Sequence, residues 1–293
     1  MDIHLLDVIT TAGIFVLVAI GLHVVVGLAG VLSVGQAAFL GIGAYATAIL
    51  TLRAGLAPFT ALLAGCAVAS ILAALLSLTA IRVRDDYLLI LTLGFGECFR
   101  LVFQNWETLT GGTRGIAGIG PFEIFGKQFP DGHGLLIVVW LAVIVVAAAV
   151  VCLERSPFGR ALIAVRDDET LARSLGRTPF AYRASAMVCG ALVTSVAGSV
   201  LAHKLSYIDS NTGFGFETSL LVFAMVVLGG RGSLPGAVSG ATALVFLPEM
   251  LRRVGFPEAT AAYLRQIIIG VVLIALSSYR PRGVFGTLRF EPR

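Results

Sequence analysis

The stretch ERSPFGRALIAVRDDETLARSLGRTPFAY, residues 154–182, decides the fold, because it is the longest polar run in an otherwise apolar chain. It holds both arginines and carboxylates, and the apolar runs on either side are long enough to cross a bilayer. A charged stretch between two spans must lie in water, and short loops rich in Lys and Arg stay on the cytoplasmic side. This stretch, called the charged segment below, therefore predicts the orientation of the whole chain.

The composition is that of a membrane protein. The 293 residues are 57% hydrophobic and 13% charged, with a mean hydropathy of +0.94, whereas soluble domains carry about 25% charged residues. Several apolar runs approach the ~20 residues that a spanning helix needs. A soluble α/β enzyme is the alternative, but its apolar runs would be short and broken by turns. The net charge of +4 does not indicate a nucleic-acid partner, because the basic residues lie mostly beside the spans.

The order of the apolar runs predicts one all-α polytopic membrane domain over residues 1–293, with about eight to ten transmembrane helices and glycine-broken segments. The start of the chain lacks Lys and Arg, so we expect it outside. Residues 104–133 form a turn-rich outer loop with balanced charges, and the basic tail, residues 279–293, is cytoplasmic. Residues 218–251 form either two crossings or a re-entrant hairpin, because their apolar runs are short.

The charged segment itself predicts an amphipathic helix with clear ends. Ser156 and Pro157 are typical of an N-cap and a first helical residue, and Gly176 is typical of a C-cap. We expect the helix to break near residues 167–169. Its apolar face either lies on lipid headgroups, drawn there by the arginines, or docks on a cytoplasmic partner. The residues alone leave both interpretations open.

Two glycine-broken segments, residues 30–35 and 232–236, occur in the two halves of the chain. We expect Ser33 to cap a helix that runs to about residue 52. Broken apolar segments in corresponding halves indicate a substrate path, where backbone N–H groups can meet a carboxylate. They are equally typical of tight helix packing.

Glu97 and Arg100 are three residues apart within an apolar run, so they share one helix face. Charges at membrane depth usually face a cavity or each other. The pair is therefore either part of a translocation path or a structural ion pair. Polarity at broken or buried positions predicts a set of path residues: Ser33, Gln36, Glu97, Thr113 and Ser233.

Four longer motifs, in order along the chain, carry a family resemblance: GLAGVLSVGQAAFLGIGAY (27–45), LLILTLGFGECFRLVFQNWETLTGGTRGI (88–116), FGRALIAVRDDETLARSLG (158–176) and FAMVVLGGRGSLPGAVSGA (223–241). Together they resemble LivM-type permeases of branched-chain amino acid ABC importers. The resemblance implies a multi-pass subunit of a bacterial inner membrane that works by alternating access. It also implies a second, LivH-type permease, two cytoplasmic ATP-binding subunits and a periplasmic solute-binding protein. Residues 104–133 would then be a periplasmic loop.

The resemblance gives the charged segment a role as a cytoplasmic coupling helix. Glu169-x-x-Ala172-x-x-x-Gly176 is similar to the EAA-type segment through which importer permeases contact their ATPases, although Thr170 and Leu171 stand where a stricter copy has alanine. The implied coupling residues are Arg166, Asp167, Asp168, Glu169, Leu171, Ala172, Leu175 and Gly176.

The chain has no Gly-x-x-x-x-Gly-Lys-[Ser/Thr] phosphate loop, so ATP would be used by a partner subunit and the chain itself would not be an enzyme. Its histidines are scattered, and the four cysteines lack a C-x-x-C spacing, so we expect no metal site and no cofactor.

Urea, short amides or other amino-acid-like solutes are alternative cargoes. A different class, a stand-alone proton-coupled transporter with Glu97 as its relay, is also an alternative. Besides protein subunits, we expect contact with membrane lipid and none with nucleic acid.

Overall fold

The computed structural model describes residues 3–80, 85–124, 127–129, 133–210, 213–230, 232–253 and the isolated positions 264, 267–268 and 270–271. Almost all of these residues are helical, which confirms the all-α class. Six helices are long and apolar enough to cross a membrane, and two shorter apolar ones follow. The basic tail and most of the last apolar run lie outside the described residues, so the count of eight to ten spans stays a prediction.

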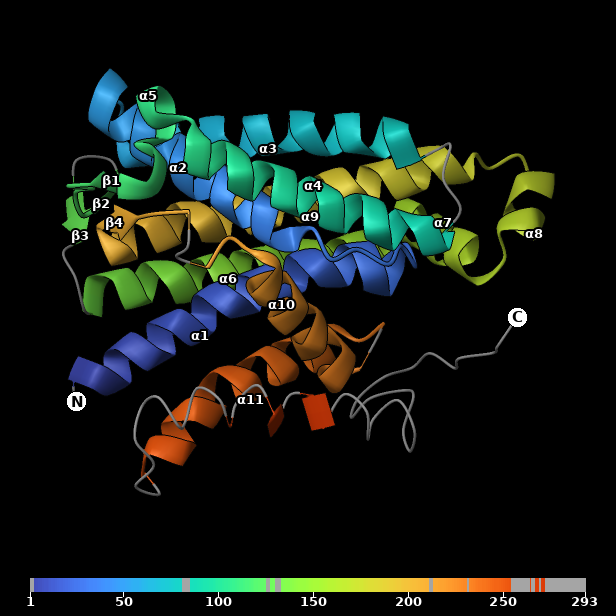
Figure 1. Cartoon of the computed structure of the whole chain (residues 1–293). Coiled ribbons are helices and arrows are strands. Elements are labelled where there is room, and N and C mark those ends of the chain that lie inside the picture. The colour runs from blue at the N-terminus through green and yellow to red at the C-terminus, as the bar shows by residue number, and fades with distance from the viewer. Residues whose placement is uncertain are drawn as a thin grey trace.

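The long helices lie side by side along a common axis (Figure 1). They are α1 (Ile3–Leu22), continued by the π-helical turn η1 (His23–Leu28), then α2 (Gln36–Ala54), α3 (Pro58–Ala80), α4 (Asp85–Asn105), α6 (His133–Arg155) and α9 (Pro179–Leu205). The shorter α10 (Phe216–Gly229) and α11 (Leu234–Arg253) form a hairpin beside α1.

The two ends of the bundle differ in structure (Figure 1). One end carries the charged segment, folded as α7 (Pro157–Asp167) and α8 (Glu169–Ser174). The other carries short elements, and we call it the strand end: α5 (Glu107–Thr110), η2 (Gly112–Arg114), β1 (Ile116–Ala117), β2 (Phe122–Ile124), β3 (Lys127–Phe129) and β4 (Tyr207–Ile208). Antiparallel pairing of β1 with β4 joins the loop after α4 to the loop after α9.

Helix α9 is the central helix of the bundle, packed against α1, α2 and α3. A Cβ on Gly198 would lie closer than 3.0 Å to the carbonyl oxygen of Leu40, and one on Gly43 would come equally close to that of Ser195. Close contact of backbones through small residues is the usual way in which membrane helices associate, because lipid supplies no hydrophobic force between them. The α2–α9 contact therefore depends on glycine.

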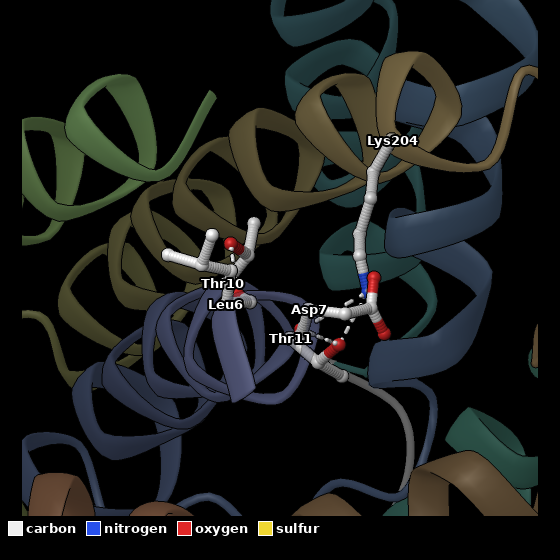
Figure 2. Close-up of polar contacts among 5 residues, drawn as sticks. All are labelled: Leu6, Asp7, Thr10, Thr11 and Lys204. Atoms are coloured by element: carbon white, nitrogen blue, oxygen red, sulfur yellow. Dashed lines mark hydrogen bonds and ion pairs between the residues drawn. The ribbon is translucent and has the colours of Figure 1, made fainter. Parts of the chain in front are cut away.

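An ion-paired lysine ties α9 to α1 at the strand end (Figure 2). Lys204 Nζ lies 3.0 Å from Asp7 Oδ1, and it also donates hydrogen bonds to the Asp7 carbonyl and to Thr11 Oγ1. Nearby, Thr10 Oγ1 donates to the Leu6 carbonyl within α1, at 2.7 Å. Lys204 is thus held by three acceptors from one turn of its neighbour.

The outward faces of α3 and α6 are apolar, as contact with hydrocarbon requires. Their exposed large side chains include Leu63, Ile71, Leu75, Ile137 and Ile144.

Candidate functional site

The charged segment forms two helices joined at Asp168. Ser156 Oγ accepts a hydrogen bond from Gly159 N at 3.0 Å, and Pro157 opens α7, as predicted. Asp168 has extended backbone (φ −150°), and its Oδ1 accepts from Leu171 N at 2.9 Å to cap α8. Gly176 follows with φ +76°, and its N–H donates to the Arg173 carbonyl. The predicted break and both predicted helix ends are confirmed.

The Asp168 side chain caps α8 and also carries a negative charge. Two substitutions separate the effect of the cap from the effect of the charge. We expect Asp168→Ala to loosen α8 by about 1 kcal/mol, because a capping acceptor is lost. Asp168→Asn keeps an acceptor and removes only the charge, so α8 should stay formed. Amide hydrogen exchange at Leu171 and Ala172 measures this. Equal protection in the two variants would contradict the capping role.

Six of the eight predicted coupling residues point away from the bundle or lie at its rim. Leu171 and Leu175 are 59% and 73% exposed. Asp167, Asp168 and Gly176 are also exposed, and Glu169 is half-buried between Arg173 and Arg183, with N–O distances of 2.5 and 3.1 Å. Charged side chains therefore surround the two exposed leucines.

The other two, Ala172 and Arg166, turn toward the permease body. Ala172 is buried on the side where α8 meets α9. The Arg166 side chain is only 14% exposed, and its Nη1 donates to the Gly27 carbonyl at 2.5 Å. The same guanidinium binds Asp167 Oδ1 through Nε and Nη2, both at 2.9 Å. Its position, 139 residues from Gly27, could not be read from the sequence.

The first glycine-broken segment separates η1 from α2, and its second half, residues 33–35, is buried. Non-helical backbone at membrane depth needs hydrogen-bond partners from protein. Val34 N donates to Thr92 Oγ1 of α4 and Ala37 N to Ser219 Oγ of α10, both at 3.1 Å. Sequence reasoning missed Thr92 and Ser219, because a lone hydroxyl in an apolar helix carries no signal of its distant partner.

The predicted cap by Ser33 is wrong. Helix α2 begins at Gln36 with Gly35 in the N-cap position and no side-chain cap. Ser33 is buried, and its Oγ accepts from Gly35 N at 3.5 Å, which places it two residues before the N-cap position. Gln36 is also buried, and its Nε2 donates to the Gly190 carbonyl at 3.2 Å and to Thr194 Oγ1 on α9. Contacts with α4, α9 and α10 thus decide where α2 starts.

The second broken segment joins α10 to α11, and its glycines are packed. A Cβ on Gly229 or on Gly236 would overlap the backbone of the other residue, and one on Gly240 would overlap the Met225 carbonyl. Ser233 Oγ accepts from Gly236 N at 3.2 Å in the first turn of α11. These contacts favour helix packing at this segment.

Glu97 and Arg100 form an ion pair on α4, with Arg100 Nε 2.7 Å from Glu97 Oε2. Arg100 Nη1 also donates to Gln104 Oε1 at 3.4 Å. The two charged side chains are 33% and 29% exposed in the isolated chain, in contrast to the apolar outward faces of α3 and α6. A face that carries charges at membrane depth is suited to protein or water rather than lipid.

The structure brings some predicted path residues together and leaves others apart. Ser33 and Gln36 flank Gly35, and a Cβ on Gly96, next to Glu97, would lie 3.8 Å from the Gly35 Cα. Thr113 is exposed in η2 at the strand end, and Ser233 lies at the α10–α11 turn. Within the described ranges, no three His, Cys, Asp or Glu side chains are grouped to hold a metal ion.

Residues 4–277 match the sequence profile of a family described as branched-chain amino acid transport system / permease component. The chain belongs to this permease family. The high-affinity branched-chain amino acid transport system permease proteins LivM of Salmonella typhimurium and of Escherichia coli K12 are each 33% identical to the permease, over 97% of its length and 70% of theirs. The autoinducer 2 import system permease protein LsrC of Escherichia coli O9:H4 is 31% identical over 64% of the permease and 54% of its own length. No solved structure matched significantly.

Membership of this family makes the chain a multi-pass inner-membrane permease subunit of an ABC importer. ATP hydrolysis belongs to a separate subunit, so the permease is not an enzyme.

Proposed function

We propose that the permease imports branched-chain amino acids, with α7 and α8 in the cytoplasm as the docking site for an ATPase subunit. The exposed pair Leu171 and Leu175 carries this proposal, because exposed leucines ringed by charge are typical of a protein interface. The opposite side of the same two helices is packed on α9 and η1. A partner that moves the leucines therefore also moves the bundle.

The orientation follows from the same segment. Its arginines favour the cytoplasmic side for this segment, and we propose the same side for the basic C-terminal tail. The strand end then faces the periplasm, where it meets a solute-binding protein. Two ATPase subunits and a second, LivH-type permease complete the proposed assembly.

We further propose that the charged face of α4 lines the translocation path, opposite the second permease. Glu97 and Arg100 form an ion pair on this face, and the pair lies next to the broken segment that starts α2. The alternating-access step would change the packing of α4 against this segment. A proton-relay role for Glu97 is less favoured, because its carboxylate already has a guanidinium partner.

Co-purification tests the assembly directly. The tagged permease is isolated in mild detergent from cells that co-express its candidate partner proteins, and the complex is reconstituted into vesicles. We expect a phosphate-loop ATPase and a second permease to co-purify, with ATP-dependent uptake of leucine, isoleucine and valine through a binding protein. Uptake of urea or short amides in place of these would change the cargo alone. A permease that purifies alone and moves solute under a proton gradient would contradict the proposal.

A further inference from the structure

The π-helical turn η1 at the end of the first span is held from two sides, by a residue just before α7 and by a residue in the last turn of α7. From one side, Glu154 Oε1 lies 2.9 Å from Nε2 of the fully buried His23. From the other, Arg166 donates to the Gly27 carbonyl at 2.5 Å. Glu154 is in the last turn of α6, and Arg166 is in the last turn of α7. The coupling helix is therefore fastened to η1 at both of its ends.

Both contacts meet at Gly27. A Cβ on Gly27 would lie 2.5 Å from His23 Nδ1, so the imidazole packs directly against this glycine. The Gly27 carbonyl lies in the last turn of η1, where carbonyl groups have no partner within the helix. A guanidinium satisfies such a group and is favoured by the negative end of the helix dipole. π-Helical turns are rare, and they occur frequently at functional sites.

Gly30 makes room for the arginine. Its φ of +70° turns the chain out of η1, and a Cβ there would lie 2.6 Å from Arg166 Cγ. The stem of Arg166 thus lies against bare backbone at the point where the broken segment begins. Four residues later Val34 N donates to Thr92 of α4, and α2 begins at Gln36.

We infer that Arg166 is a positioning residue of transport, which links α7 to the first broken segment rather than to the ATPase. His23 and Glu154 form the second attachment. A displacement of α7 therefore moves Gly27, and through residues 29–37 the movement reaches α4 and α10. Thr92 of α4 accepts from Val34 N in the broken segment, Ser219 of α10 accepts from Ala37 N in the first turn of α2, and α4 also carries the proposed path. The inference rests on the proposed function, because it assumes that α7 and α8 are moved by an ATPase.

The ratio of solute taken up to ATP hydrolysed tests this link in the reconstituted complex. We expect Arg166→Ala to lower the ratio at least about tenfold, while the ATPase stays bound and its hydrolysis rate changes less than about twofold. The matched control is Arg160→Ala in the same helix, because Arg160 is exposed and its guanidinium donates to the Arg155 carbonyl of its own segment. The control should keep the wild-type ratio.

Arg166→Lys covers the case in which the alanine variant is not inserted. A lysine keeps the charge, but one ammonium cannot reproduce the fork that binds the Gly27 carbonyl and Asp167 together. We expect the ratio to fall at least about threefold.

A wild-type ratio in either variant overturns the inference. So does loss of the bound ATPase in Arg166→Ala, which would make Arg166 a docking contact. Failure of the wild-type complex to move solute with ATP overturns the proposed function itself, and is seen before any variant is compared.

Discussion

Replacing Leu171 and Leu175 together with aspartate should release the ATPase and reduce uptake at least about 100-fold. Both leucines are exposed in the isolated chain, so their replacement removes little packing from the permease itself. If each loses about 1.5–3 kcal/mol of buried apolar contact in the assembly, the pair exceeds the ~2.7 kcal/mol that a hundredfold loss of affinity requires.

Two measurements test the double variant. One is the amount of ATPase that co-purifies with the tagged permease, and the other is uptake per unit of permease in the membrane. Thr178→Asp is the control, because it adds one of the two negative charges of the double variant to an exposed position of the charged segment outside α8. The control should retain the ATPase. A double variant that binds ATPase and transports at the wild-type level would show that the exposed leucines are not the docking surface.

Gly198→Ala should destabilise the permease by more than about 3 kcal/mol, at the upper end of the range for overpacked cores. The added methyl would meet the Leu40 carbonyl and the Ala44 nitrogen, which are backbone atoms that cannot rotate away. We expect the melting temperature in detergent to fall by about 10 °C and the level of inserted protein to fall with it.

Gly94→Ala is the matched control for this substitution. Gly94 also lies within a candidate membrane span, but a Cβ there meets nothing within 4 Å. The control should melt at or slightly above the wild-type temperature, because alanine is the better helix former. Equal melting temperatures for the two variants would show that the α2–α9 contact can relax.

The contrast between the two glycine-broken segments bears on the path. Around residues 30–35 the backbone is held by hydroxyl groups from two other helices, so this break is a junction between α2, α4 and α10. Next to the second segment, Gly229, Gly236 and Gly240 bring α10 and α11 into backbone contact. The two segments looked alike in sequence because glycine serves a turn and a close approach equally well.

Features that depend on neighbouring residues could be predicted from the amino-acid sequence. The spans follow from the length of the apolar runs, and the ends of α7 and α8 follow from Ser156, Asp168 and Gly176, whose bonds reach only three residues along the chain. Only the tertiary structure decided that α9 is central, that Arg166 turns inward, and that α2 starts at Gln36 rather than at a serine cap. Each of these depends on a contact between segments far apart in the chain, such as Arg166 with Gly27, Val34 with Thr92, and Gly198 with Leu40. No local pattern encodes such a partner, because a buried hydrogen bond or a close backbone approach is defined by two positions that only the fold brings together.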